Sequence, residues 1–86
     1  MKHTEKILKA LANRRRLAII KFLNTKGNAK VGDIAKEIGI SFKATSKHLG
    51  VLRTADIVDR EQVSLEMYYS LSKPLSDIIL SVIDVL

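Results

Sequence analysis

The chain has no cysteine and no tryptophan, a single proline and four glycines among its 86 residues. Without thiols it has neither a disulfide framework nor a thiolate metal site, which is typical of proteins from a reducing compartment. Acidic residues are also few, nine against fifteen Lys and Arg, so the formal net charge is +6. This basic balance favours a polyanionic partner.

Long apolar runs are missing as well. No uncharged apolar stretch approaches the ~20 residues that a membrane-spanning helix requires. The N-terminal segment, MKHTEKILKALANRRR, is charged and amphipathic, without the apolar region of a secretory signal. The length fits one domain, residues 1–86, with no repeat. We therefore expect a soluble cytoplasmic domain that does not associate with membranes.

The positive charge is concentrated in the first third of the chain. Residues 1–30 hold nine Lys or Arg against one acid, Glu5, whereas residues 55–86 hold two bases against six acids. Such a basic region is a solvated surface in some proteins, but phosphate neutralisation gives it a clear use in nucleic-acid binding.

The most informative segment is VGDIAKEIGISFKATSKHLGVL, residues 31–52, within a predicted helix-turn-helix at 31–54. Its first half has apolar residues at helical spacing and then Gly39, which tolerates the left-handed conformation that ends a helix. Ser41 follows as a good N-cap for a second helix. On that helix Thr45, Leu49 and Leu52 share one face, and cationic residues occupy the other.

A second helix of this kind enters the DNA major groove. Phe42 is expected either to contact a thymine methyl or to fold back on Ile40 and the stem of Lys43. His48, without catalytic partners, is expected to have a structural or phosphate-binding role. The predicted DNA-binding residues are Ser41, Phe42, Lys43, Ser46, Lys47 and His48, with Arg60 from the segment that follows.

Helical spacing predicts a first helix over residues 4–11, capped by Thr4, and a second helix that Asn13 begins. Alternation from Leu65 to Leu71 indicates a half-buried strand, with Ile57–Glu61 as its hairpin partner. Pro74 is expected to open a last helix, capped by Ser72 or Lys73. The fold class is therefore mainly α with a small β-hairpin, in the order of four helices, two strands and one helix. This is a winged helix-turn-helix, with its wing at 57–71 and its last helix at 73–86.

Three segments together resemble the ArsR family of bacterial and archaeal winged-helix repressors. They are ALANRRRLAIIKFL (10–23), IAKEIGISFKATSKHLGVL (34–52) and MYYSLS (67–72), in the expected order. The resemblance implies a homodimer that binds a palindromic operator, with the first and last helices at the dimer interface.

The last helix carries an apolar stripe too wide for the core of one small domain, which independently favours a two-fold dimer. The predicted interface residues are Ile7, Leu8, Leu11, Leu75, Ile78, Ile79, Val82, Ile83 and Leu86.

The chain departs from the family pattern in two places. Metal-sensing members carry Cys, or His with carboxylates on the last helix, whereas this chain has only Asp77 and Asp84 there, so neither a metal site nor any other cofactor is expected. The wing segment DREQVSLE, residues 59–66, has three acids against Arg60, so phosphate should repel it.

We expect a sequence-specific, homodimeric regulator of transcription, acting as a repressor through residues 41–54, with no enzymatic activity. The acidic wing leaves open an alternative, a winged-helix module for protein–protein interaction with weak DNA binding. A third possibility is a sensor of a small molecule or of Zn²⁺ through Asp77, Asp84 and a histidine.

Overall fold

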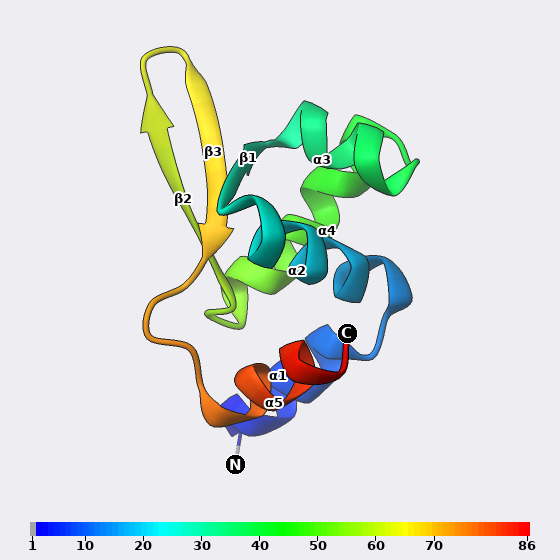
Figure 1. Cartoon of the computed structure of the whole chain (residues 1–86), viewed down its shortest axis with the longest axis vertical. Helices are drawn as coiled ribbons and strands as arrows, with labels where there is room; N and C mark the ends of the chain where they lie inside the picture. Colours follow the sequence, from blue (N-terminus) through cyan, green and yellow to red (C-terminus); the bar gives the residue numbers. More distant parts are fainter. Residues whose placement is uncertain (1) are drawn as a thin grey trace.

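The computed structural model describes residues 2–86. These described residues form five helices and three short strands, about 37 Å along the longest axis. Figure 1 shows the helices α1 and α5 at one end and the β2–β3 hairpin extending toward the other, with α2 between them. The elements are α1 (Lys2–Leu11), α2 (Arg14–Lys26), β1 (Asn28–Lys30), α3 (Val31–Ile38), α4 (Phe42–Thr54), β2 (Val58–Val63), β3 (Glu66–Leu71) and α5 (Asp77–Val85).

The first two helices differ in how they begin. α1 starts at Lys2, so the prediction of a start at Thr4 was wrong. Asn13 caps α2 as predicted, because its side-chain oxygen accepts the N–H groups of Arg15 at 2.9 Å and Arg16 at 3.1 Å. Gly27, at a φ of 94°, ends α2.

The winged helix-turn-helix is confirmed, but the sheet has one more strand than predicted. β1 pairs antiparallel with β3, so the strand order is β1-β3-β2. Three residues are too few to show an alternating pattern, and β1 forms because β3 offers it a hydrogen-bonding edge. β2 is left at the other edge of the sheet.

The hairpin extends further along β2 than its predicted partner strand at Ile57–Glu61. Val63 pairs with Glu66, which leaves Ser64 and Leu65 as a two-residue turn. Ser64 supplies the positive φ, 60°, that such a tight turn requires. The prediction that Leu65 belongs to the buried row of the strand was wrong, because it lies in this turn and its side chain is 94% exposed.

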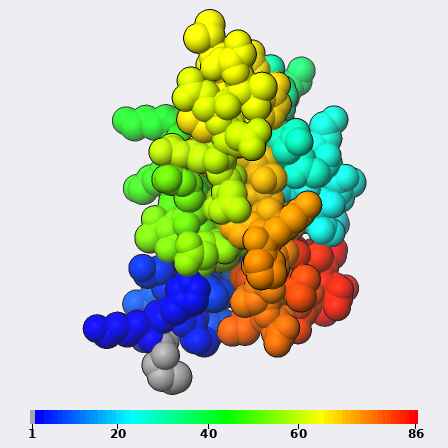
Figure 2. Space-filling view, turned by 90° about the vertical axis from the view of Figure 1, so that its left-hand side faces the viewer, coloured from blue at the N-terminus to red at the C-terminus, as the bar shows by residue number. Residues whose placement is uncertain are grey.

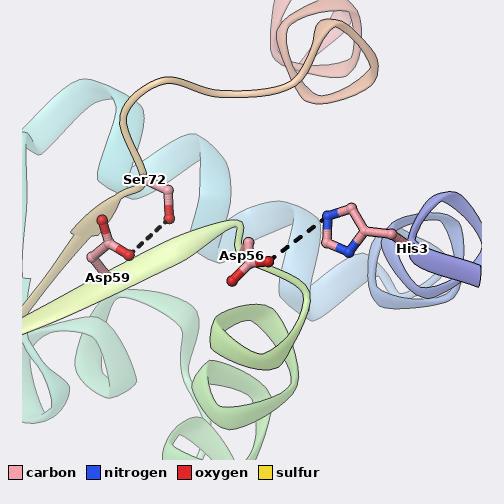
Figure 3. A network of polar contacts seen from close by, with 4 residues as sticks. All are labelled: His3, Asp56, Asp59 and Ser72. Carbon is pink, nitrogen blue, oxygen red and sulfur yellow. Dashed lines mark hydrogen bonds and ion pairs between the residues drawn. The ribbon is translucent and has the colours of Figure 1, made fainter.

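The start of the last helix also differs from the prediction. α5 begins at Asp77 with Ser76 as its N-cap, whose hydroxyl accepts the N–H of Ile79 at 3.4 Å. Ser72 is not available as a cap because its hydroxyl donates to Asp59 Oδ1 at 3.1 Å (Figure 3). Its N–H donates to the Ile57 carbonyl at 2.9 Å. Ser72 therefore ends the sheet, and α5 starts four residues later than expected.

One hydrophobic core joins all the helices to the sheet. Apolar side chains at helical spacing on α2, α3 and α4 belong to this core, in which α4 packs against β2 while α2 and α3 pack against β1 and β3. The residues with no more than 1% exposure include Ile19, Ile20, Leu23, Ile34, Leu49, Leu52, Ile57, Val58 and Ile79. This core holds α4 in a fixed orientation, with one face left to solvent.

Candidate nucleic-acid interface

The turn between α3 and α4 is built by a helix stop and a helix cap. Gly39 adopts the left-handed conformation, φ 79° and ψ 34°, and its N–H donates to the Ala35 carbonyl at 2.8 Å. Ile40 N–H donates to the same carbonyl at 3.2 Å, so the end of α3 is satisfied within the turn. A side chain at Gly39 would be strained at this φ, which fixes the direction in which the chain leaves α3.

Ser41 begins α4 as predicted. Its Oγ accepts the N–H of Ala44 at 3.0 Å, and its carbonyl accepts the hydroxyl of Thr45 at 2.8 Å. Thr45 has no exposed surface, and neither Leu49 nor Leu52 has any. These three residues form the inward face of α4, in agreement with the pattern in the sequence.

The opposite face of α4 is open to solvent. Lys43 and Lys47 are both exposed and lie four residues apart, one helical turn, while Ser46 beside them is half-buried. Phe42, at the start of the helix, is 61% exposed, so most of its ring remains available for contact. Ser41 is also exposed, so four of the seven predicted DNA-binding residues, Ser41, Phe42, Lys43 and Lys47, are exposed in the first half of α4 or at its N-cap.

His48 lies on the flank of α4, next to α1 and α2. Its Nδ1 is 3.3 Å from a guanidinium nitrogen of Arg16, and Arg16 also donates to the carbonyls of Ala10 at 2.6 Å and Lys9 at 3.2 Å. Burial lowers the pKa of His48 most, followed by the positive charges of Arg16, Arg15 and Lys47. The imidazole is therefore neutral near pH 7, and Nε2 is the nitrogen left to donate to an outside group.

Arg60 is the predicted DNA-binding residue that lies apart from α4. It is exposed on β2 and opposite Tyr69 in the hairpin. The acids Glu61 and Glu66 lie on the sheet face opposite to Arg60, where Glu61 is exposed and Glu66 pairs with Lys30 at 2.9 Å. The hydrogen bond to Glu66 and its negative charge raise the pKa of Lys30.

The predicted dimer residues divide into three groups. Ile7, Leu11 and Ile79 are buried in the core of a single chain, so they have little surface left for a partner. Leu8 and Leu86 are exposed. The half-buried members are Leu75, Ile78, Val82 and Ile83.

Leu80 and Val85 are exposed apolar residues of α5 that were not among the predicted interface residues. Their signal was present in the sequence, because they widen the apolar stripe of the last helix beyond one face.

Two further observations concern metals and membranes. Within residues 2–86 there is no group of three or more His, Asp or Glu side chains arranged to hold a metal ion. In the same part of the chain no helix has the length and apolar character needed to cross a bilayer.

Comparison with known proteins supports the likeness seen in the sequence. The family model described as "Bacterial regulatory protein, arsR family" matches residues 13–60. The chain is 37% identical over 79 residues to the nodulation protein NolR of Rhizobium meliloti, across 92% of this chain and 62% of that protein. The chain spans 60–66% of the length of the three curated relatives it matches.

Solved structures show the same fold. HlyU from Vibrio cholerae superposes with a TM-score of 0.81 at 30% identity, covering 98% of this chain and 87% of that one. The curated HlyU of that species is called a transcriptional activator and is 35% identical over 66 residues, 77% of this chain and 60% of that protein. The homodimeric winged helix-turn-helix DNA-binding domain of Mb0332 from Mycobacterium bovis gives a TM-score of 0.85 at 27% identity, covering 98% and 75% of the two chains.

Proposed function

Because the chain belongs to the arsR family of bacterial regulatory proteins, we propose that it binds a palindromic operator in duplex DNA as a homodimer. The observation that carries this proposal is the exposed cationic start of α4, on a helix whose inward face is completely buried. The major groove admits an α-helix, and lysine side chains there bind phosphates or guanine edges. Ser41, Phe42, Ser46 and His48 complete the contact surface on α4.

The dimer is supported by apolar surface at one end of the molecule. Leu8 of α1 is 53% exposed, and on or after α5 Leu80, Val85 and Leu86 are 47%, 83% and 36% exposed. Figures 1 and 2 show α1 and α5 together at this end. A second copy related by a two-fold axis at this end would cover these side chains. The dimer would then present two copies of α4 to half-sites about one helical turn (~34 Å) apart.

Repression is the direction we propose, because a dimer that occupies an operator excludes other proteins from the same DNA. The protein would act in the cytoplasm, through binding rather than catalysis, with no cofactor. A reporter placed behind the operator tests the direction, and expression is expected to fall when the protein is present. Increased expression would instead make it an activator, the role that HlyU of Vibrio cholerae has by its name.

The decisive experiment is selection of bound fragments from random duplex DNA, followed by a salt titration. The wild-type protein should select a palindrome and lose affinity steeply as salt rises. The double variant Lys43→Glu, Lys47→Glu should abolish binding while circular dichroism and sedimentation show an intact folded dimer.

The matched control is Lys21→Glu, Lys26→Glu, which makes the same change of charge on exposed positions of α2. This control should retain the palindrome, with at most a modest decrease in affinity from the changed net charge. Absence of wild-type binding to any duplex at low salt would overturn the proposal.

That result would favour a second candidate function, a protein-interaction module. The wing supports this candidate, because Leu65 is exposed in the turn at its tip and the edge strand β2 that leads into this turn carries the exposed acids Asp59 and Glu61. Such a surface suits a basic protein partner better than a phosphate backbone.

A further inference from the structure

α1 carries a row of lysines on one side. Lys2, Lys6 and Lys9 follow each other at intervals of four and three residues, so they share a helix face, and all three are exposed. The buried face of the same helix holds Ile7 and Leu11, so packing against the core fixes which way the lysine row points. Helix formation alone does not require three cations on one face.

The lysine row lines a groove shared with the recognition helix. This groove between α1 and α4 has a volume of about 660 Å³, and its α4 side is formed by Lys47, Gly50, Val51 and Thr54. Lys47 thus belongs both to the exposed face of α4 and to the groove. Figure 2 shows side chains of α4 (green) and α1 (dark blue) projecting from the same side of the molecule. The cationic surface of α4 therefore continues onto α1.

The position of α1 indicates which part of an operator this surface meets. On α1 the exposed Leu8 belongs to the apolar end that we assign to the dimer interface, so the lysine row lies near the two-fold axis. The wing tip lies at the opposite end of the molecule (Figure 1). DNA that runs along the exposed face of α4 passes α1 between the two half-sites.

We propose that Lys2, Lys6 and Lys9 form a phosphate-binding row that grips the DNA backbone between the two half-sites of the operator. The inference rests on the proposed function. It adds a second DNA-binding surface, on α1, which contacts the phosphates between the two half-sites. Each lysine neutralises one phosphate and contributes to affinity irrespective of base sequence. With a wing segment that carries three acids beside Arg60, this chain binds the DNA backbone more strongly at the centre of the operator than at its outer ends.

Glu5 is the one acid among the described groove residues, and it pairs with Lys9 at 3.2 Å in an exposed i, i+4 arrangement. Phosphate competes with Glu5 for Lys9, and the Glu5 carboxylate repels the DNA backbone. Glu5→Gln is therefore expected to increase the affinity for DNA, whereas the lysine variants are expected to decrease it.

The test uses the selected operator, with and without methylphosphonate linkages that remove the charge of the central phosphates. For Lys2→Gln, Lys6→Gln, Lys9→Gln, the slope of log affinity against log salt should become shallower by about 2–3, at roughly 0.9 for each phosphate that is no longer neutralised. Relative to affinities extrapolated to 1 M salt, this corresponds near 0.1 M salt to a decrease in affinity of roughly 10²–10³-fold. Central methylphosphonates should weaken wild-type binding by a similar factor and weaken the triple variant by little, because the two changes remove the same ionic interactions.

The control variant Lys21→Gln, Lys26→Gln, Lys73→Gln removes three exposed lysines that do not line this groove. It should respond to central methylphosphonates like the wild type. If the α1 variant binds with the wild-type slope, or responds fully to central methylphosphonates, the lysine row is refuted while operator binding through α4 stands. Failure of the wild type to bind any duplex would refute the proposed function itself, so the two failures are distinguishable.

Discussion

Arg16 and His48 lie 32 residues apart in the chain, and a guanidinium nitrogen of Arg16 approaches Nδ1 of His48 to 3.3 Å. The same guanidinium donates to the carbonyls of Lys9 and Ala10 at the end of α1. The last carbonyls of a helix have no i+4 donor inside it, and here the Lys9 carbonyl also accepts the N–H of Ala12 at 3.3 Å. A cation at this end of a helix also interacts favourably with its dipole. One side chain at the start of α2 thus joins α1 to the recognition helix.

Arg16→Met should destabilise the protein by about 1.5–3 kcal/mol, because it removes three hydrogen bonds from a charged donor, to Ala10, Lys9 and His48, while keeping an apolar stem of similar length. Urea unfolding measured at constant pH gives the change in free energy. Arg14→Met, at an exposed neighbouring position, should stay within about 0.5 kcal/mol of the wild type. Equal destabilisation of the two variants would show that Arg16 has no special structural role.

The lowered pKa of His48 predicts a dependence of stability on pH. In the unfolded chain the imidazole takes up a proton near pH 6.5, whereas in the folded protein burial, Arg16, Arg15 and Lys47 delay protonation to lower pH. The unfolded state therefore binds more protons in this window. The resulting contribution of His48 to the free energy of unfolding is fully present above about pH 6.5. It is lost as pH falls through the pKa of His48 in the folded protein.

This dependence can be isolated with His48→Gln. Between about pH 7.5 and 5, the unfolding free energy of the variant should fall less than that of the wild type. An NMR titration, with the variant used to assign the His48 resonance, should give a pKa below the ordinary value. In Arg16→Met the pKa should rise, since one neighbouring charge has gone. A wild-type pKa at or above 6.5 would contradict the predicted environment.

Arg60→Gln should make the salt dependence of DNA binding shallower by about 1, the amount expected when one phosphate is no longer neutralised. Lys73→Gln is the matched control, because Lys73 is exposed and lines a separate cavity with Asp59 and Glu61 on the other side of the wing. Gel-shift titrations at several salt concentrations measure both slopes. An unchanged slope for Arg60→Gln would mean that the wing does not touch DNA.

Leu80→Asp together with Val85→Asp should dissociate the dimer without unfolding the chain, because both residues are exposed in a single copy. Charges placed within an apolar interface have to be desolvated on association, which opposes it. Sedimentation velocity should show a monomer for this variant. Leu65→Asp at the wing tip, at 94% exposure, should leave the dimer intact. If both variants dissociate it, the interface is not confined to the end formed by α1 and α5.

Much of the fold was predictable because it depends on short-range patterns. The apolar spacing of α3 and α4, Gly39 as the stop of α3 and Ser41 as the cap of α4 are each encoded within a few residues. Alternation in β3 likewise predicted the wing. These elements agree with the structure since local conformation and burial favour the same arrangement.

Elements that depend on distant partners were predicted less well. β1 exists only because β3 lies beside it, and Ser72 is engaged by Asp59, thirteen residues away, so it cannot cap α5. Leu65 matched the alternation of its strand, but the register of Val63 with Glu66 placed it in the turn. A period of two does not say where a strand ends.

The sequence by itself determined that this is a basic, mainly helical winged helix-turn-helix whose recognition helix, α4, is cationic on its outer face. It could do so because charge, spacing and caps are local properties. Only the tertiary structure decided which of those side chains remain available. Packing buried Ile7, Leu11 and Ile79 within one chain and left Leu8, Leu80 and Val85 exposed. It also brought the lysines of α1 beside Lys47 of α4. The order of residues along a chain does not specify which helix faces share a groove, because that depends on how the core fixes their orientation.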